Sequence, residues 1–389
     1  MKELTVGIIG VGNMGSAHLA CIYGGNIRGL RVLAVCDIDE TRRAAVRAAY
    51  PDLAVYEDFH ALLAQKEIGA VIIAVPHRLH GQIACAAFES GKHVLVEKPL
   101  DVRLSEARRV CKAARQSGRV FGIMLNQRTN ALFAKAREIV QSGELGKPVR
   151  SNWIITNWFR TESYYRSGGW RATWAGEGGG VLLNQAPHNL DLWQWICGMP
   201  LAVRAVCNVG KYHSIEVEDE AIVYAEFEGG ASGVFITSTG ESPGTNRLEI
   251  VGTKGKLVLE DGLLKQYTLE GDTRDIIAQS DKGFVKPRYT YSEYKSTRET
   301  AHAGILQNFT DAVLHGAALL APGEEGTHEL EISNAAYLSA WTGGARIALP
   351  MDTERFDQLL SEKAAHSVTH ENIAAPMTDG YKKRWQVNW

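Results

Sequence analysis

Lysine and histidine side chains are of types that can take part in proton transfer, and two of them, Lys98 and His188, lie in distinctive stretches of this sequence. Lys98 directly follows the buried-strand pattern HVLV, and Pro99 after it bars helical geometry and helps to hold the direction of the lysine. His188 lies within GGGVLLNQAPHNLDLWQW (178–195), between a run of glycines and a helix-like segment rich in tryptophan. A histidine titrates near neutral pH and therefore suits a general base. From these residues alone, a loop lysine that reaches solvent and a histidine that caps the following helix remain open.

A glycine-rich stretch near the N-terminus has the spacing of a dinucleotide-binding turn. GIIGVGNMG places Gly10, Gly12 and Gly15 in the pattern G-x-G-x-x-G after an apolar strand. The next strand pattern, LRVLAVCDID, ends at Asp37, where a carboxylate can accept hydrogen bonds from the adenine-ribose hydroxyls. A glycine turn without a ligand is the alternative, but strand, glycines, helix, strand and acid in this order favour a dinucleotide site. The carboxylate would repel a 2'-phosphate, so NAD is favoured over NADP, although Arg42 follows closely.

The third strand pattern, AVIIAVP, ends at Pro76 and is followed by His77 and His80. This end belongs to the carboxyl edge of a parallel sheet, where ligands bind. A metal site is disfavoured because no third ligand has suitable spacing, and we expect a loop histidine near the nicotinamide and a helix-capping histidine instead. The residues assigned to cofactor binding are Gly10, Gly12, Asn13, Met14, Asp37, Pro76, His77, His80, Glu97 and Lys98, with no metal ligands.

Two patterns of elements position these residues. Over residues 1–125, apolar β-branched runs alternate with amphipathic helices, which predicts an α/β Rossmann domain with a doubly wound parallel sheet. Over residues 126–350, strands follow each other through turns and several alternate apolar with polar residues, which predicts an α+β domain with an antiparallel sheet. Residues 351–389, ending in YKKRWQVNW, are predicted to form a C-terminal arm.

The composition excludes some classes of partner. The formal net charge is -2 over 389 residues, and no long block of like charge occurs, so we expect neither nucleic acid nor an anionic membrane as partner. No apolar stretch reaches the length of about 20 residues that a membrane span needs. The 6 cysteines are scattered without zinc spacing, which suggests reduced thiols of a cytoplasmic protein. A small molecule is the expected partner.

Four motifs in order, GIIGVGNMG, SGKHVLVEKPL, GELGKPV and GGGVLLNQAPHNLDL, resemble the Gfo/Idh/MocA oxidoreductase family. The resemblance extends to about Pro350 and implies a Rossmann domain followed by a large open, mostly antiparallel sheet, with the active site between them. It implies that Lys98 lies by the nicotinamide and the substrate hydroxyl, that the Lys98–Pro99 bond is cis, and that His188 is the acid/base group. Asp191, one helical turn on, could orient the His188 ring.

The sequence departs from the common family pattern at position 184. Asn184, followed by Gln185, stands where many members have aspartate, and an amide can bind a sugar hydroxyl but cannot accept its proton. Such an amide pair resembles the family's sugar 3-dehydrogenases and levoglucosan-type enzymes. Trp193 and Trp195 are expected in the core or at a subunit contact, and His302 could reach the site. The residues assigned to substrate binding are Asn184, Gln185, Arg128, Tyr164, Trp170 and Arg171.

These observations together predict an NAD-dependent sugar or cyclitol dehydrogenase that oxidises a secondary ring hydroxyl, at C3 of a pyranoside or anhydrosugar, to a ketone. Two alternatives remain: NAD-dependent glycoside cleavage by oxidation and elimination, and a dinucleotide-binding sensor without turnover. An open sheet with an apolar face predicts a homodimer or homotetramer.

Overall fold

The computed structural model describes residues 3–296 and 299–368. The chain forms two compact units. Unit 1 comprises residues 1–129 and 300–330, and unit 2 comprises residues 130–299 and 331–389. The prediction of one continuous second domain over 126–350 therefore needs correction, because the chain returns to unit 1 after residue 299. The C-terminal stretch also differs from a plain arm: residues 353–365 form helix α12, whereas the aromatic end at 369–389 lies outside the described residues.

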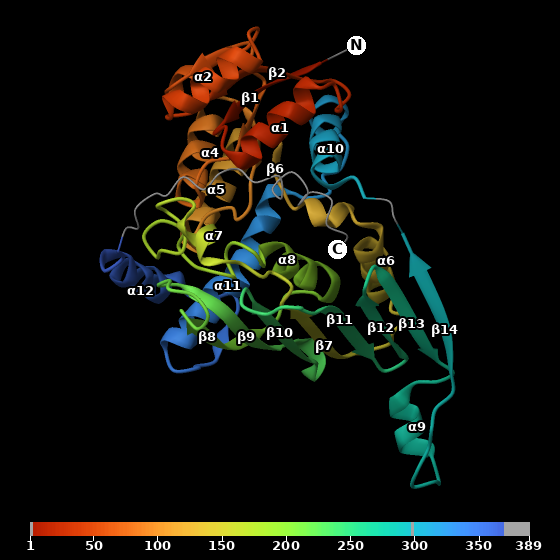
Figure 1. The fold of residues 1–389 in the computed structure, drawn as a ribbon. Coiled ribbons are helices and arrows are strands. Elements are labelled where there is room, and N and C mark those ends of the chain that lie inside the picture. Colours follow the sequence, from red (N-terminus) through yellow and green to blue (C-terminus); the bar gives the residue numbers. More distant parts are fainter. Residues whose placement is uncertain (1–2, 297–298, 369–389) are drawn as a thin grey trace. The chain divides into compact units, whose positions relative to one another are not determined.

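Unit 1 contains a six-stranded sheet in the order β3-β2-β1-β4-β5-β6, and its strand pairs are all parallel (Figure 1). The strands β4 and β5 are buried along almost their whole length, as their apolar runs predict. The strands are β1 (Leu4–Ile9), β2 (Leu30–Cys36), β3 (Ala54–Tyr56), β4 (Ala70–Ile73), β5 (His93–Val96) and β6 (Phe121–Ile123).

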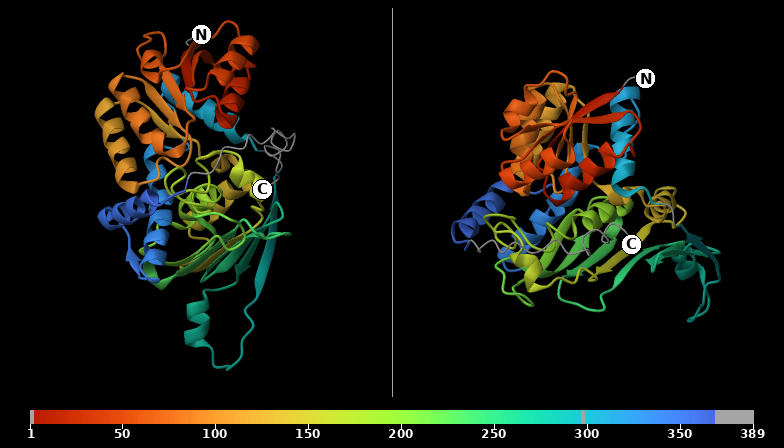
Figure 2. Two further views of the ribbon diagram at one scale, coloured as in Figure 1. Left: turned by 60° about the vertical axis from the view of Figure 1, so that its left-hand side comes forward. Right: turned by 45° about the horizontal axis from the view of Figure 1, so that its top comes forward.

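Helices lie on both faces of this sheet, with α4 and α5 on one face and α1 and α10 on the other (Figures 1 and 2). This arrangement confirms the predicted doubly wound α/β architecture. The helices are α1 (Asn13–Tyr23), α2 (Glu40–Ala49), α3 (Phe59–Leu63), α4 (His80–Glu89), α5 (Leu104–Ser117) and α10 (Ala301–His315).

Unit 2 contains a nine-stranded sheet in the order β14-β13-β12-β11-β7-β10-β9-β8-β15. Its pairs are antiparallel except for β7 with β10, so the predicted mostly antiparallel sheet is confirmed. The strands are β7 (Pro148–Ile155), β8 (Ala202–Val209), β9 (Glu218–Glu226), β10 (Ser232–Ser238), β11 (Asn246–Gly252), β12 (Gly255–Glu260), β13 (Leu263–Leu269), β14 (Tyr289–Lys295) and β15 (Ile347–Ala348).

One face of the unit 2 sheet carries helices α6, α8 and α11 (Figures 1 and 2). Trp193 of α8 packs on Phe235 with ring centroids 5.6 Å apart and donates from Nε1 to Ser151, which confirms its predicted core position. Trp195 instead stacks beneath the guanidinium of Arg137 at 4.5 Å. The helices are α6 (Ala131–Gln141), α7 (Glu162–Arg166), α8 (Pro187–Cys197), α9 (Thr273–Gln279), α11 (Gly326–Trp341) and α12 (Thr353–Ala365).

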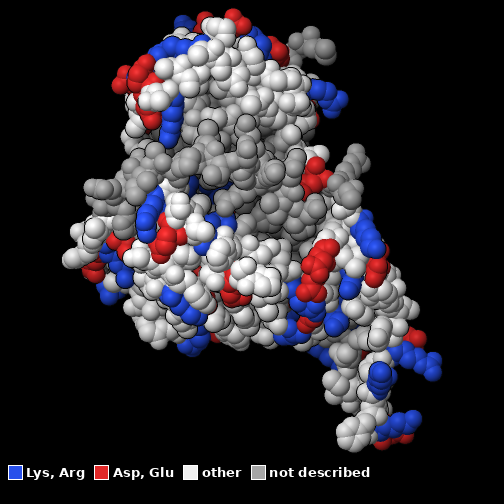
Figure 3. All heavy atoms as spheres, in the orientation of Figure 1, with Lys and Arg blue, Asp and Glu red and all other residues white. Residues whose placement is uncertain are grey.

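The surface and the cysteines agree with the composition. On the face drawn in Figure 3, Lys and Arg side chains are interspersed with Asp and Glu. The six cysteines are free thiols. Within residues 3–296 and 299–368, no helix has the length and apolar character that crossing a bilayer would require.

Candidate active site

The glycine turn of unit 1 is built as a dinucleotide turn requires. Gly10 adopts a φ of +88°, which an L side chain rarely adopts. A Cβ on Gly15 would lie 1.8 Å from the carbonyl oxygen of Gly10, so only glycine lets α1 approach β1 this closely. Gly12 precedes α1 without a side-chain cap, and a Cβ there would meet nothing nearer than 3.5 Å. Backbone N–H groups at this helix start are therefore accessible to a pyrophosphate.

Asp37 lies at the end of β2 beside the glycine turn. Its Oδ2 accepts the Val11 N–H at 2.9 Å, and its Oδ1 accepts the Asp39 N–H at the same distance. Arg42, whose side chain is half exposed, lies with Nη1 3.4 Å from Oδ2. The carboxylate is thus fixed where the motif requires the ribose-binding acid, with a cation at its side.

His77 and His80 follow β4 at the same edge of the sheet. Pro76 precedes a short 3-10 helix that begins at His77, which is buried. His80 is the first residue of α4 and not its cap, so that prediction needs correction. Its ring nitrogens lie 2.7 Å from the carbonyl oxygen of Pro99 and 2.8 Å from that of Val75. His80 therefore joins the loops that follow β4 and β5.

Glu97 and Lys98 lie at the end of β5, as predicted, and the Lys98–Pro99 bond is cis. Glu97 is buried, its Oε1 lies 2.7 Å from Nε2 of His18, and its Oε2 accepts the Lys98 N–H at 3.3 Å. Burial opposes the charge of Glu97, but the hydrogen bond and charge of His18, with weaker contributions from His302 and Lys98, lower its pKa to about 2. An ionised carboxylate therefore holds the backbone of the lysine.

His302 and His18 were not assigned to the site from the sequence, although His302 was expected within reach of it. The ring of His302 lies 5.7 Å from that of His18, and burial lowers the His302 pKa to about 4. His18 shares the buried face of α1 with Gly15 and Leu19. That spacing of three residues after the last glycine is the sequence signal that could have pointed to His18.

Arg128, for which a substrate contact is predicted, also has a structural role within unit 1. Its side chain is buried, forms an ion pair with Glu325 and donates to the Leu320 carbonyl at 3.2 Å. This guanidinium therefore ties the end of the first segment of unit 1 to the returning segment 300–330.

In unit 2, the glycine run at 178–180 is followed by a turn whose backbone is hydrogen-bonded to the side chain of Glu218 of β9. The carboxylate accepts the N–H groups of Gly180 and Leu182, both at 2.9 Å, and the hydroxyl of Tyr337 at 2.7 Å. A Cβ on Gly180 would lie 1.9 Å from the carbonyl oxygen of Glu218, which explains the need for glycine there. Burial raises the pKa of Glu218 to about 7. Sequence reasoning missed this support because it lies on a distant strand.

His188 is the second residue of α8, and the cap position is Ala186, so the capping alternative is wrong. Asn184 lies in the turn before the helix and therefore does not share a helical face with His188. Asp191 accepts a hydrogen bond from Gln194 at 3.0 Å. The turn 180–186 and the first turn of α8 thus place Asn184, Gln185 and His188 in one short stretch.

A polar cluster surrounds the phenol oxygen of Tyr164. Arg171 Nη1 donates to it at 3.0 Å, Gln185 Nε2 at 3.1 Å and Asn184 Nδ2 at 3.3 Å. Glu177, which the sequence did not indicate, accepts a second hydrogen bond from Asn184 and the Ala172 N–H at 2.7 Å. Four predicted substrate residues, Tyr164, Arg171, Asn184 and Gln185, are therefore brought together.

Trp170 joins this cluster through Arg171, whose guanidinium carbon lies 4.6 Å from the centre of the indole ring. The stacked tryptophan and guanidinium offer an apolar ring face beside fixed N–H donors. Such a pairing suits the C–H patches and hydroxyl groups of a carbohydrate.

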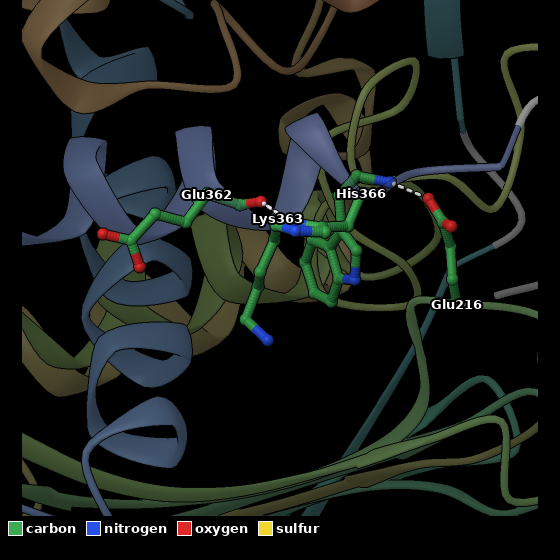
Figure 4. A pocket seen from close by; sticks show the side chains of 5 residues that line it. Glu216, Glu362, Lys363 and His366 are labelled. Carbon is green, nitrogen blue, oxygen red and sulfur yellow. Dashed lines mark hydrogen bonds between the residues drawn. The ribbon is translucent and has the colours of Figure 1, made fainter.

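A separate hollow in unit 2 lies between the loop at Trp174 and the end of α12, with a volume of about 350 Å³ (Figure 4). Glu216 in its wall accepts the Trp174 N–H at 2.7 Å and the Val368 N–H at 3.1 Å. Lys363 lies 5.5 Å from the Trp174 ring centre and 5.1 Å from that of Trp341. These contacts fasten α12 to the loop and contain none of the predicted site residues.

The described ranges contain no group of three or more His, Cys, Asp or Glu side chains that could hold a metal ion. The chemistry available to the two units is thus that of a dinucleotide turn, a lysine at a strand end and a histidine at a helix start. These features define an oxidoreductase that uses a nicotinamide dinucleotide.

Comparison with known families gives the same class. Residues 4–125 match the NAD-binding Rossmann fold of an oxidoreductase family, GFO_IDH_MocA, and residues 133–258 match the GFO/IDH/MocA C-terminal domain. The chain belongs to the Gfo/Idh/MocA oxidoreductase family.

Individual relatives are distant but extend over most of the chain. The scyllo-inositol 2-dehydrogenase (NAD(+)) of Bacillus subtilis is 23% identical over 86% of this chain and 93% of its own length. The levoglucosan dehydrogenase of Pseudarthrobacter phenanthrenivorans is 27% identical over 66% of this chain and 74% of its own. The crystal structure of the WlbA dehydrogenase from Chromobacterium violaceum, in complex with NADH and UDP-GlcNAcA, has a TM-score of 0.77 at 25% identity and covers 90% of this chain and 97% of that one.

Proposed function

We propose that this protein oxidises a secondary ring hydroxyl of a sugar to a ketone with NAD⁺ as the acceptor, and that the reacting position is C3 of a pyranoside or anhydrosugar. The proposal depends on one observation: the backbone N–H of Lys98, at the end of β5, donates a hydrogen bond to an ionised Glu97. This strand end belongs to a domain that matches the family's NAD-binding Rossmann fold. Relatives that act on inositol and on levoglucosan support a polyhydroxylated ring as substrate. The complex of the WlbA dehydrogenase with UDP-GlcNAcA supports a sugar ring as well.

Each residue has a separate role in the proposed reaction. Lys98 binds and orients the reacting hydroxyl, and its positive charge favours loss of the hydroxyl proton. His188 accepts that proton as the general base. Trp170 and Arg171 bind the ring, and Asn184 and Gln185 bind its other hydroxyls. Discrimination among sugars then depends on these amide and guanidinium donors, because a site built to bind a hydroxyl rejects analogues that lack it.

The residues of unit 1 fit NAD. The uncapped start of α1 and the open space at Gly12 suit the pyrophosphate, and Asp37 suits the ribose hydroxyls. When bound, the cofactor supplies the acceptor for the hydrogen that leaves the ring carbon. The negative charge of Asp37 disfavours the 2'-phosphate of NADP, so NAD is the proposed cofactor.

The first experiment is to mix the purified protein and NAD⁺ with methyl glycosides, hexoses, levoglucosan, inositols and sugar nucleotides, and to follow NADH absorbance. We expect NADH formation with at least one pyranoside or anhydrosugar, and weaker formation with NADP⁺. Glycoside cleavage without net NADH would instead indicate oxidation and elimination. NAD binding by calorimetry without turnover of any ring would indicate a sensor and contradict the proposed activity.

Substitutions then test the two assigned residues. Lys98→Met and His188→Ala should each lower kcat/KM by about 10²- to 10⁴-fold, because each removes a group that acts in the transition state. Lys92→Met is the matched control: Lys92 precedes the same strand, and its ammonium donates to the Gln65 and Ile68 carbonyls. Circular dichroism and NADH binding should show that the variants fold. Near-wild-type turnover by either variant would refute the assigned mechanism.

A further inference from the structure

The phenol oxygen of Tyr164 lies within hydrogen-bond distance of three side-chain nitrogens. Arg171, Gln185 and Asn184 each direct an N–H at it, at 3.0, 3.1 and 3.3 Å. A phenol oxygen has two lone pairs besides its own O–H, whereas a phenolate can accept three donors. Asn184 cannot be reversed, because its amide nitrogen also donates to the carboxylate of Glu177. Arg171 has no acceptor to offer at all.

The charges around the ring favour the anion in the same way. The guanidinium carbons of Arg171 and Arg160 lie 4.8 and 5.1 Å from the ring centre of Tyr164. Burial and the charge of Glu177 act to raise the pKa of Tyr164. The charges of Arg171 and Arg160 and the hydrogen bond from Gln185 outweigh these effects, so the pKa of Tyr164 is lowered. The remaining titratable neighbour is Tyr165, whose ring centre is 5.2 Å away.

The sequence places this oxygen close to the start of α8. Two of its three donors, Asn184 and Gln185, precede Pro187 directly, and His188 is the second residue of the helix. Gln185 is only 5% exposed, and its Oε1 has no hydrogen-bond partner among the described residues, so one face of the cluster still offers an acceptor to a ligand. The cluster thus places a phenol oxygen with three nearby donors, and an amide oxygen without a described partner, at the stretch of chain that leads into the proposed base.

We propose that Tyr164 is a second acid/base residue of this site, a phenolate that takes over the proton from His188 and so replaces the carboxylate that position 184 lacks. This inference rests on the proposed function. The hydroxyl proton passes to the His188 imidazole as the carbonyl forms, and NAD⁺, when bound, would supply the acceptor for the hydride that leaves the ring carbon. The imidazolium N–H bond then breaks, the proton joins the Tyr164 oxygen, and neutral Tyr164 later releases it to water.

A titration without substrate tests the phenolate itself. The near-ultraviolet absorbance of tyrosinate, followed against pH, should show one tyrosine that ionises below the ordinary range in the wild-type protein. Tyr164→Phe should abolish that transition. Tyr165→Phe, the matched control, should retain it, because burial raises the pKa of Tyr165, whose hydroxyl bonds Thr239 at 2.8 Å. In the competing arrangement, the Gln185 amide is rotated so that its oxygen accepts a hydrogen bond from a neutral Tyr164 hydroxyl. This arrangement predicts that no tyrosine ionises below the ordinary range, and that result would overturn the proposal.

Kinetics tests the role. Tyr164→Phe should lower kcat by about 100-fold. In the plot of kcat against pH, it should also remove the ionisation that is assigned to Tyr164, which is the one of lower pKa. Incorporation of 3-fluorotyrosine at position 164 should restore turnover and move that ionisation to lower pH, because fluorination makes the phenol more acidic. A purely structural tyrosine would leave the position of the ionisation unchanged, which would contradict the proposal. NADH formation by the wild-type protein decides the proposed function separately.

Discussion

At the scale of single residues, the proposed preference for NAD over NADP depends on Asp37. Its two oxygens are held by the N–H groups of Val11 and Asp39, so the carboxylate has a fixed direction. Arg42 is 3.4 Å away and would otherwise be able to pair with a 2'-phosphate. In the proposed site the negative charge therefore has two effects, since it would bind the ribose hydroxyls and it also pairs with the nearby Arg42.

Replacing that charge should change cofactor choice. We expect Asp37→Asn to weaken NADH binding by about 10-fold, through loss of charge-assisted hydrogen bonds, and to strengthen NADPH binding because Arg42 becomes available. Calorimetric titration with each nucleotide measures both changes without any substrate. Asp58→Asn is the control, because Asp58 caps α3 and carries the same charge, whereas Asp39 itself lies 3.6 Å from Arg42. Unchanged NADPH affinity in Asp37→Asn would show that the carboxylate does not set the preference.

Several site residues were predictable because their position in the chain fixes their surroundings. Asp37 and Lys98 each end a buried parallel strand, and such ends meet at one edge of a sheet. Arg128 was not predictable, because its partner Glu325 is 197 residues further on. A pattern of neighbouring residues carries no information about such a long-range ion pair.

At the scale of elements, the glycine run before α8 depends on β9. Glu218 holds the N–H groups of Gly180 and Leu182, and Gly180 packs against its backbone without room for a Cβ. The glycines indicate from the sequence alone that another backbone packs closely against this run. The sequence does not indicate which strand that backbone belongs to. Helix α8 itself begins at Pro187, because proline favours the first turn of a helix.

Glu218→Gln should destabilise unit 2 by about 1–3 kcal/mol, because the amide NH₂ would face a backbone N–H that now has no acceptor. The pH dependence should change as well. Because the folded-state pKa of Glu218 is raised from 4.5 to about 7, the folded state retains a proton that the unfolded state loses. This contribution to wild-type stability is therefore lost as pH rises from 4.5 to about 7.

Denaturant unfolding across that pH range measures both effects. The Glu218→Gln profile should lack the decline that Glu218 contributes, while Glu228→Gln, at an exposed turn after β9, should match the wild type. A profile that falls equally in wild type and Glu218→Gln would assign the decline to other groups.

At the scale of the whole molecule, the chain crosses between its units more than once. Residues 300–330 return to unit 1 after strands β7 to β14 of the unit 2 sheet and before its last strand, β15, and α11 begins in one unit and ends in the other. The sequence shows helices in this region but not the unit to which they belong, since amphipathic helices can cover either sheet. Fold class was therefore predictable, whereas the division into units was only partly so.

The face of the unit 2 sheet opposite to Trp193 carries an apolar row. Cross-strand pairing aligns Val206 with Ile222, Ile222 with Ile236, and Ile236 with Ile154, so the row runs across four strands. Val206 is 56% exposed and Ile222 is 40% exposed. A continuous apolar row of this kind on a sheet face typically packs against another surface.

We expect a second copy of the chain to cover this row, because a symmetric dimer brings the same row against itself. Ile222→Asp would place a charge in the centre of that contact, where it would be buried without a partner. Light scattering at micromolar concentration should therefore show a dimer or tetramer for the wild type and a smaller species for Ile222→Asp. Ile277→Asp tests an exposed aliphatic side chain on α9, beyond the sheet, and should leave the assembly intact (Figure 1). If Ile277→Asp dissociates the assembly and Ile222→Asp does not, the contact lies on the segment that carries α9 and the sheet face has another use.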